Sequence, residues 1–578
     1  MVENQKILGI DFGTTNSKMA FIEMDEPTII ENREGLINTP SVVYFKENSE
    51  VLVGEEAKHN LISYPTRTVA SIKRKMGTGF KKKVGNESYP AEYIGAHIFR
   101  KILFDAEART GLRFNAVVVS VPANFSDDQR QAIKDSAEIA GINVVKLINE
   151  PTAAALAYGF KEENEKKIMV YDFGGGTFDV SILSIGDGFF DVDASFGENK
   201  LGGDDIDQLI ANMICRQIAS EHEINIKKDL SALQSIIDAA EAAKCALSST
   251  VSTNIKLPFI GKGANDEPIK FEYDLNRKQF NKMIAGVVER TKKPVEQALQ
   301  DAALGMNEID EIILVGGTTK IPYVQEFIKK TFNKKPKYST DPYQVVALGA
   351  AVSSLEISRG TSRKKAKRID ISDVISRSLG VLTADGTVSH IIKRNTKIPI
   401  TRTKTYTNAW PFIREVIIPA YEGENIFPDK NQFLGDFWVD IEPMPLHRNQ
   451  IDISFNVGEE FGILNVNAVD IKSGNKREVK MKSSGRLSAK EKNKWMMKMS
   501  NMMCRSVRIE NKVLRSTTVL NVHPNMRISD IKTELKKLNF LGDGEELYQK
   551  KNRLAEDVLV SELNLRPKSK LSISKVME

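Results

Sequence analysis

The strongest constraint on the fold is a pattern that occurs three times, an apolar run that ends in a glycine-rich turn. The turns read IDFGTT at 10–15, YDFGGGTFD at 171–179 and LVGGTTKIP at 314–322. Each turn places backbone N–H groups at the end of a predicted strand, where no side chain blocks an anion. Three unrelated hairpin turns are the alternative, and the repetition argues against it. The pattern predicts one phosphate site shared by three strand ends.

Two of the turns also carry a carboxylate, Asp11 in the first and Asp172 in the second. Two carboxylates beside a polyphosphate provide what Mg²⁺ needs, directly or through its waters. The segment is not a Walker P-loop, because no GxxxxGK[ST] occurs. Threonine hydroxyls at the turns add further donors: Thr14, Thr15, Thr177 and Thr318.

Length and composition describe a multidomain globular chain. At 578 residues it exceeds the ~250–300 residues at which single cores stop growing. A net charge of +6 is small for this length, and solvated lysines explain it without nucleic acid or a membrane surface. The first residues lack the apolar core of a signal peptide, and no apolar run reaches the ~20 residues of a membrane span. We therefore expect neither nucleic acid nor membrane as a partner.

The three cysteines, Cys215, Cys245 and Cys504, lie too far apart for a zinc or disulfide pattern, which fits a reducing compartment. The predicted location is the cytoplasm. A basic run at 358–374 raises the nucleus as a second location, although a solvated linker explains it better.

Changes in the pattern of strand-like and helical segments along the sequence divide the chain into five parts. Residues 1–360 alternate strand-like and helical segments, which is typical of α/β architecture. Residues 361–374 form the linker, and 375–485 read as an all-β module of short alternating segments. Residues 486–504 predict one helix, and 505–578 a small ββαβ unit.

Helical periodicity predicts one apolar face on each of two helices. The face of the first helix carries Trp495, Met499, Met502 and Met503. The face of the second carries Ile528, Ile531, Leu535 and Leu538.

Long motifs in order resemble the seventy-kilodalton heat-shock chaperones, the DnaK-type ATPases. They are GIDFGTTNS, VPANFSDDQRQAIKDSAEIAGINVVKLINEPTAAALAYG, DFGGGTFDVSIL, LGGDDID and LVGGTTKIP, and the resemblance covers residues 1 to about 490. It implies an actin-like (ribonuclease H-like) ATPase domain, an all-β sandwich that binds peptides, and a shortened helical lid.

In that family the glycine turns hold ATP or ADP with Mg²⁺, and K⁺ is a further candidate ion. The implied catalytic residues are Lys73, which positions the attacking water, with Glu150, Asp172, Thr177 and Asp179. Only the resemblance gives Lys73 a role, since a lone lysine in a basic stretch is usually solvated. The implied nucleotide-binding residues are Asp11, Gly13, Thr14, Thr15, Asn16, Gly174, Gly175, Gly176, Thr177, Gly202, Gly203, Asp204, Glu241, Lys244, Cys245, Ser248, Gly316, Gly317, Thr318 and Lys320. Asp11 and Asp172 are the implied metal ligands.

Several departures from the family weaken the expected function. Members commonly sandwich adenine between two arginines, and here those positions hold Cys245 and Lys320, which stack poorly on a base. Tyr343 replaces the usual acid. Part of one small subdomain between Lys73 and Pro122 is missing, which puts some nucleotide-exchange factors in doubt. We expect weaker or less base-selective nucleotide binding.

The resemblance also implies coupling between the domains. Pro122 and Arg130 match the pair that relays the nucleotide state, and Asp373 is kept in the linker. The linker reads RIDISDV instead of a leucine-rich stretch, so we expect weaker coupling.

The implied peptide pocket consists of Val381, Ala384, Tyr406, Ala409, Val416 and Ile418. Plain sandwich core is the alternative explanation for Val416 and Ile418. Trp410 and Phe412 are expected to be exposed. Because one short helix replaces the long lid, we expect weak binding and fast exchange of peptides.

The tail at 505–578 resembles a ubiquitin-like (β-grasp) α+β fold in topology and spacing. The positions of ubiquitin's apolar recognition patch are largely polar here, at Tyr548, Ser572 and Ser574. A partner in the ubiquitin system is one hypothesis, and a structural cap or another docking module is the alternative.

The sequence thus predicts an ATP-dependent chaperone for extended apolar segments of unfolded proteins, with J-domain co-chaperones and nucleotide-exchange factors as partners. The alternative is a non-enzymatic nucleotide-binding adaptor whose tail recruits a partner. A small-molecule kinase on the same fold lacks support, because no such kinase carries the sandwich motifs.

Overall fold

The computed structural model describes residues 6–160, 162–262, 267–338, 342–358, 369–458, 462–474, 476–479, 485–503, 505–514, 516–522, 528–538, 540–542, 545–549, 552–556 and 570–575. The basic run at 359–368 and Cys504 lie outside these residues. The chain divides into two compact units, and each is described by itself. Unit 1 is Met1–Glu138 with Ile142–Ser488, and unit 2 is Ile139–Gly141 with Ala489–Glu578.

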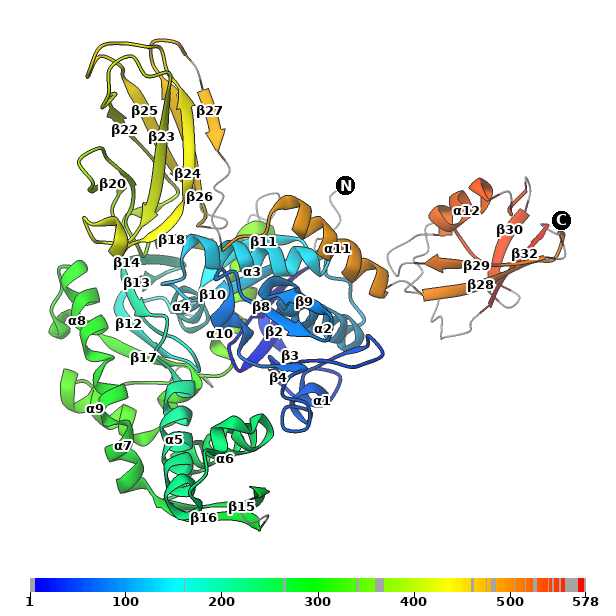
Figure 1. Ribbon diagram of the computed structural model, residues 1–578, viewed down its shortest axis with the longest axis horizontal. Helices are drawn as coiled ribbons and strands as arrows, with labels where there is room; N and C mark the ends of the chain where they lie inside the picture. The colour runs from blue at the N-terminus through cyan, green and yellow to red at the C-terminus, as the bar shows by residue number, and fades with distance from the viewer. Residues whose placement is uncertain are drawn as a thin grey trace. The chain divides into compact units, whose positions relative to one another are not determined.

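Unit 1 contains two sheets of the same design (Figure 1). Each begins with parallel strands and continues through an antiparallel hairpin whose tip is a glycine turn. The first sheet has the order β11-β10-β1-β2-β3, with β4 on β2. Its strands are β1 (Ile7–Asp11), β2 (Asn16–Glu23), β3 (Glu26–Ile30), β4 (Thr39–Pro40), β10 (Ala116–Val121) and β11 (Val144–Asn149).

The second sheet has the order β17-β12-β13-β14-β18-β21. Its strands are β12 (Lys166–Phe173), β13 (Phe178–Gly186), β14 (Phe189–Glu198), β17 (Glu311–Val315), β18 (Asp370–Val374) and β21 (Lys397–Ile398). The strands predicted to precede the second and third glycine turns are thus confirmed as β12 and β17.

Helices α4 (Glu150–Gly159) and α10 (Val345–Ser358) pack against each other within the core shared by both sheets. Small side chains allow a close approach: a Cβ at Gly349 would lie only 1.6 Å from the carbonyl oxygen of Ala153. The first sheet is also contacted by α2 (Ala91–Thr110), and α3 (Asp127–Ile139) follows β10 in the chain. The two hairpin turns are therefore held by a rigid, fully buried scaffold.

Smaller subdomains flank the two sheets. Beside the first sheet lie β5 (Val43–Phe45), β6 (Val51–Val53), α1 (Glu55–Lys58), β7 (Thr68–Val69), η1 (Ile72–Lys75), β8 (Lys81–Val84) and β9 (Glu87–Pro90). Beside the second lie α5 (Gly203–His222), α6 (Leu230–Ser249), β15 (Ser252–Lys262), β16 (Pro268–Asn276), α7 (Arg277–Glu289), α8 (Lys292–Asp301), η4 (Gly317–Lys320) and α9 (Pro322–Phe332).

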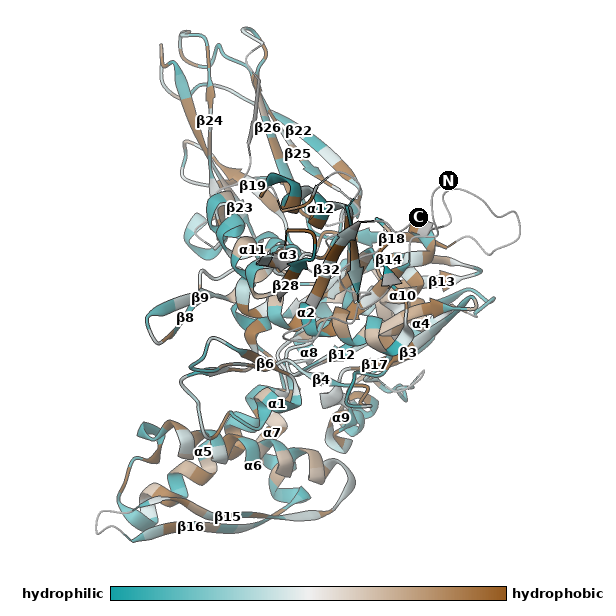
Figure 2. Cartoon of the chain, turned by 90° about the vertical axis from the view of Figure 1, so that its right-hand side faces the viewer, coloured by the Kyte–Doolittle hydropathy of each residue, from teal (hydrophilic) through white to brown (hydrophobic). Residues whose placement is uncertain are grey.

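The all-β module is a sandwich of two four-stranded sheets, β20-β19-β23-β24 and β22-β25-β26-β27. Along β25 (Ile451–Val457) buried and half-buried residues alternate, as expected for a strand with one face in a core. Figure 2 shows this alternation as brown and teal segments on the sandwich strands. The other strands are β19 (Leu379–Leu382), β20 (Val388–Ile392), β22 (Ile400–Tyr406), β23 (Glu415–Glu422), β24 (Gln432–Asp440), β26 (Leu464–Asp470) and β27 (Lys476–Val479).

Unit 2 begins with helix α11 (Ala489–Met503), on which Trp495 and Met499 are buried. A five-stranded sheet follows, in the order β29-β28-β32-β30-β31 with one helix, α12 (Ile528–Lys537). Ile528, Ile531 and Leu535 are buried as predicted. Leu538 is 56% exposed, because α12 ends at Lys537; its predicted place on the buried face was wrong. The strands are β28 (Arg505–Asn511), β29 (Ser516–Val522), β30 (Glu545–Gln549), β31 (Asn552–Arg553) and β32 (Lys570–Lys575).

Candidate functional site

The first glycine turn closes the hairpin of β1 and β2. Asp11 is the last residue of β1, and its antiparallel partner in β2 is Lys18. Residues directly opposite in such a pair project to the same face of the sheet. The Nζ of Lys18 accordingly lies 3.1 Å from Oδ2 of Asp11, and the hydroxyl of Ser120 donates to Oδ1 at 3.4 Å. The Asp11 carboxylate is thus paired on both oxygens.

The second glycine turn closes the hairpin of β12 and β13, where Asp172 faces another acid, Asp179. Asp179 accepts a hydrogen bond from the backbone N–H of Asn124 at 3.1 Å. Burial, with the neighbouring charge of Glu150, raises the pKa of Asp179 to about 7. Burial and repulsion from Glu150, Asp179 and Asp11 raise the pKa of Asp172 well above its usual range. This hairpin carries an excess of negative charge.

The third glycine turn packs directly on the second. The hydroxyl of Thr318 donates to the carbonyl oxygen of Gly174 at 2.8 Å, and the N–H of Gly203 donates to the same oxygen at 3.0 Å. Gly316 has a φ of +81°, and a Cβ there would lie 2.4 Å from the carbonyl oxygen of Phe173. The tertiary structure therefore brings together the three turns that the sequence singled out.

The turns line a cleft of about 810 Å³. Of the residues predicted to bind nucleotide or to act in catalysis, these line it: Asp11, Gly13, Thr14, Thr15, Asn16, Lys73, Glu150, Asp172, Gly174, Gly175, Thr177, Glu241, Lys244, Cys245, Ser248, Gly316, Gly317, Thr318 and Lys320. The remaining ones stand behind the second turn, outside the lining: Gly176, Asp179, Gly202, Gly203 and Asp204.

An ion pair between Lys73 and Glu150 lies at the floor of the cleft, and both side chains are almost fully buried. Burial and the charge of Asp11 raise the pKa of Glu150, although Lys73 opposes the rise. A lysine in this place can orient a water molecule or a phosphate oxygen. The site therefore combines donors for phosphate with carboxylates near the same point.

The far end of the cleft carries the substitutions noted in the sequence. The ammonium of Lys320 lies 3.9 Å from the ring centroid of Tyr343. Across the cleft, Lys244 bonds to Asp207 at 2.6 Å, and burial raises the pKa of the Cys245 thiol. No arginine is among the described lining residues, so no guanidinium can stack on a base there.

The cleft fits a metal ion that takes only part of its ligands from protein. Among the described residues, no group of three or more His, Cys, Asp or Glu side chains is arranged to hold a metal by itself. Asp172, with its raised pKa and its acidic neighbours, is the carboxylate that gains most from a cation. Mg²⁺ commonly completes such sites with phosphate oxygens and water.

Sequence reasoning missed one charged residue of the described cleft lining, Lys18, which lies beside Asp11. The signal was present, because Asp11 and Lys18 lie at equal distances from the centre of the Thr14–Thr15 turn. A hairpin with that centre pairs them across the two strands.

The comparisons with known proteins agree with this geometry. The family model described as Hsp70 protein matches residues 7–89 and 79–556. The chain belongs to the Hsp70 family. It is 44% identical over 488 residues to the protein named chaperone protein DnaK from Thermotoga neapolitana, covering 84% of this chain and 82% of that one. The DnaK proteins of Thermotoga petrophila and Thermotoga maritima match equally well.

As a member of the Hsp70 family, the chain is an ATP-dependent chaperone that hydrolyses ATP, as the motifs predicted. No finding supports the adaptor alternative. Of the helices in the described parts of the chain, none has the length and apolarity of a membrane span.

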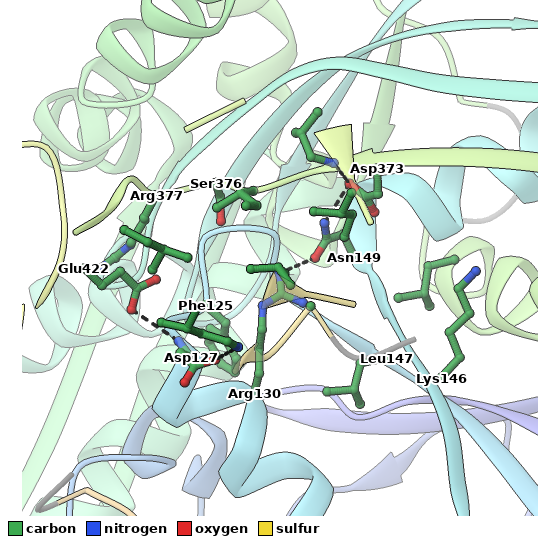
Figure 3. A pocket seen from close by; sticks show the side chains of 18 of the residues that line it. Phe125, Asp127, Arg130, Lys146, Leu147, Asn149, Asp373, Ser376, Arg377 and Glu422 are labelled. Atoms are coloured by element: carbon green, nitrogen blue, oxygen red, sulfur yellow. Dashed lines mark hydrogen bonds between the residues drawn. The ribbon is translucent and has the colours of Figure 1, made fainter. Parts of the chain in front are cut away.

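In this Hsp70 the described end of the predicted linker, residues 369–374, contributes strand β18 to the second sheet. β18 pairs in parallel with β14, and Ile369, Ile371 and Val374 are buried in the core beside α4 and α10. A hydrogen-bond chain connects the linker to the ATPase domain (Figure 3). Arg130 donates to Asn149 at 2.6 Å, and Asn149 donates to Asp373 at 3.0 Å.

Pro122 is buried, and Ala123 follows it directly in the chain. The carbonyl oxygen of Ala123 accepts hydrogen bonds from Arg130 at 3.2 Å and from the linker-side hydroxyl of Ser376 at 2.6 Å. Of the three residues predicted to relay the nucleotide state, Arg130 and Asp373 therefore lie within one hydrogen-bonded network, and Pro122 directly precedes Ala123 of that network.

The predicted peptide residues of this Hsp70 divide between core and periphery. Val381 and Ile418 belong to the buried core of the sandwich, and Tyr406 and Val416 pack on that core while partly exposed. Ala384 is exposed and Ala409 is half-buried. The structure thus supports the core explanation for Ile418 more than for Val416. Trp410 and Phe412 are exposed as predicted, at 63% and 66%.

Proposed function

We propose that ATP and ADP bind in the cleft with their phosphates on the three glycine turns. The observation that carries this proposal is the contact between the turns: a hydrogen bond joins the third turn to the second, Thr15 of the first packs against Gly175 of the second, and all three line one cleft. Fixed backbone donors stabilise a polyphosphate without any reorganisation. The nucleoside would extend toward Lys244, Cys245 and Lys320.

Mg²⁺ in this proposal is held chiefly by Asp172, with Asp11 in a supporting position because its oxygens are already paired. When bound, the ion supplies charge neutralisation for the phosphates. K⁺ remains a prediction from the resemblance.

Hydrolysis in this proposal depends on positioning, since phosphoryl transfer requires little covalent chemistry from the protein. Lys73 would orient the attacking water. Glu150 holds the Lys73 ammonium in place through their buried ion pair. Asp179, with a pKa of about 7, would accept or share a proton near the same point.

The same proposal assigns peptide gating to the docked sandwich. Arg394 of the sandwich segment bonds to Asp301 at 2.7 Å, and the backbone N–H of Leu464 donates to Asp127 at 2.7 Å. Together with β18, these bonds tie the sandwich to the ATPase domain. A nucleotide that favours one arrangement changes peptide affinity only through its different affinity for the two states.

Apolar segments of unfolded proteins are the proposed clients, held as an added extended strand with a side chain near Tyr406 and Val416. J-domain co-chaperones and nucleotide-exchange factors are the proposed partners, and the cytoplasm is the proposed location. Because α11 alone follows the sandwich before the tail begins, we propose weak, fast-exchanging peptide binding.

The experiment that tests this function is single-turnover ATP hydrolysis by the full chain, with and without an apolar peptide and a J-domain. Slow hydrolysis that both ligands accelerate supports the coupled cycle. ATP binding without turnover, under conditions in which the chain is folded, rejects it.

We further propose that residues 505–578 form a ubiquitin-like domain. The order β29-β28-β32-β30-β31, with a parallel central pair and one helix, supports this proposal. A partner of the ubiquitin system is one hypothesis for its role. Binding of the purified chain to ubiquitin receptors, measured against a chain that lacks 505–578, tests the hypothesis.

A further inference from the structure

The two glycine hairpins of the cleft differ in one respect that bears on how they bind phosphate. In both, an acid precedes the turn and a second side chain faces it across the hairpin. In the second hairpin the facing residue is an acid, so Asp172 and Asp179 repel each other. In the first hairpin the facing residue is Lys18, so the acid Asp11 has a cation attached to the protein itself.

Lys18 is held in a defined place. Its side chain is 7% exposed, and its ammonium is 3.1 Å from the Asp11 carboxylate. An ammonium has three hydrogen-bond donors, and this contact uses one. Lys18 lines the same cleft as Thr14, Thr15 and Asn16. The remaining donors are therefore near the turn that is expected to receive a phosphate.

The other ammonium groups of the cleft have partners in different places. Lys73 is paired with Glu150 at the floor, and Lys244 is paired with Asp207 at the nucleoside end. Lys320 lies 3.9 Å from the centre of the Tyr343 ring, and the Lys18 ammonium lies 5.9 Å from the same ring. Among the described lining residues, Lys18 is the one whose ammonium group lies at the first turn.

We infer that Lys18 is a phosphate-binding residue, a cation built into the first hairpin that donates to the nucleotide while Asp11 holds it in position. The inference rests on the proposed nucleotide site. It makes the cleft asymmetric: the first hairpin neutralises phosphate with its own lysine, and the second requires a metal ion at Asp172. The competing explanation is that Lys18 only neutralises Asp11 and never contacts the nucleotide.

The first test compares ADP with adenosine, which lacks the phosphates, by calorimetry on the full chain in EDTA. Lys18→Met removes the charge and keeps most of the side-chain volume. We expect ADP affinity to fall roughly ten- to hundredfold, as for the loss of a hydrogen bond to a charged group, and adenosine affinity to stay unchanged. An unchanged ADP affinity, or an equal loss for both ligands, would overturn the inference.

Lys101→Met is the matched control, because Lys101 also forms an ion pair with a buried acid, Asp105 at 2.7 Å, away from the cleft. It should lower the melting temperature to a similar extent and leave both affinities unchanged.

A double-mutant cycle with Asp11→Asn separates the two explanations. If Lys18 contacts phosphate, adding Lys18→Met to Asp11→Asn still costs about tenfold or more in ADP affinity. If Lys18 serves only as a counter-charge, the double variant binds ADP as Asp11→Asn does, and the inference is rejected.

Rescue by a small cation gives an independent readout. Methylammonium should restore ADP affinity to Lys18→Ala, and tetramethylammonium, which has no N–H donor, should not; equal effects of the two would overturn the inference. If the unaltered chain binds neither ADP nor ATP, the proposed nucleotide site itself fails. Binding by the unaltered chain with no effect of Lys18→Met rejects only the role of Lys18.

Discussion

At the scale of single residues, the cleft is a balance of buried charges. Burial, together with neighbouring acids, raises the pKa values of Glu150 and Asp172, and Lys73 is the cation at the floor. Removing one member of a buried ion pair leaves the other uncompensated, so substitutions here affect folding as well as chemistry. Each residue-scale prediction therefore needs a binding measurement beside the activity.

Lys73→Ala should lower single-turnover ATP hydrolysis about a hundredfold or more, because the attacking water would no longer be held in position to attack the phosphate. ADP affinity should change far less. Rapid-quench hydrolysis and calorimetry on the same preparation measure both. Lys134→Ala, at a half-buried position of α3 that does not line the cleft, is the control. Hydrolysis within twofold of the unaltered chain would show that Lys73 is not needed.

Lys320→Arg combined with Cys245→Arg should tighten ADP binding about tenfold, because planar guanidinium groups stack on a base and an ammonium does not. The gain in affinity should be larger for ADP than for tripolyphosphate, which has no base on which an arginine could stack. Cys245→Ala is the control that alters the thiol without adding an arginine. A double variant with unchanged affinity would mean that the Lys320–Tyr343 pair already serves the base.

At the scale of elements, the linker strand β18 joins the ATPase domain of unit 1 to the sandwich. It lies between β14 and β21 in the second sheet, and the described residues Ile369, Ile371 and Val374 are buried. The sequence RIDISDV thus places isoleucines at alternate positions, as a half-buried strand requires. The linker is apolar on one face despite its polar composition.

Ile371→Ser should remove most of the stimulation of hydrolysis by peptide while basal hydrolysis remains. Truncating a buried isoleucine and adding a hydroxyl costs about 2–4 kcal/mol of docking at this strand. Hydrolysis rates with and without a saturating apolar peptide measure the effect. Ser372→Ala, at a half-buried position of the same strand, is the control. Full stimulation in Ile371→Ser would contradict a coupling role for β18.

At the scale of the whole molecule, unit 1 joins a nucleotide cleft to a sandwich through a buried polar interface. Glu422 of the sandwich accepts a hydrogen bond from the backbone N–H of Asp127 at 3.2 Å (Figure 3). Burial raises the pKa of Glu422 to about 7, with Asp128 and Glu424 adding to the rise and Arg377 and Arg130 opposing it.

The docked arrangement should therefore weaken as the pH rises. An exposed glutamate ionises near pH 4.5, and docked Glu422 ionises near pH 7. Between these values the undocked state loses its proton first, so docking is strongest below about pH 4.5 and falls until about pH 7. Protection of the linker from limited proteolysis at pH 6 and 7.5 measures this. Glu422→Gln should abolish the pH dependence; a persistent dependence would assign it to another group.

The tail should fold without the rest of the chain, because β28–β32 and α12 enclose their own core, which includes Ile509, Ile531 and Leu547. An isolated 505–578 fragment should melt cooperatively by circular dichroism, although its small core predicts modest stability. Ile531→Ala should cost about 2–4 kcal/mol and Thr533→Ala, on the exposed side, little. A non-cooperative melt would mean that 505–578 requires other parts of the chain.

Much of this protein was determined by sequence alone, because its signals are local. The apolar runs, the glycine turns and the long motifs predicted the α/β domain, the sandwich and the nucleotide cleft. Leu538 was misplaced because periodicity does not show where α12 ends. Only the tertiary structure decided the packing of the third glycine turn on the second, the burial of the linker as β18 and the raised pKa of Glu422. These depend on which distant side chains share a low-dielectric environment, and such proximity is a property of packing rather than of spacing along the chain.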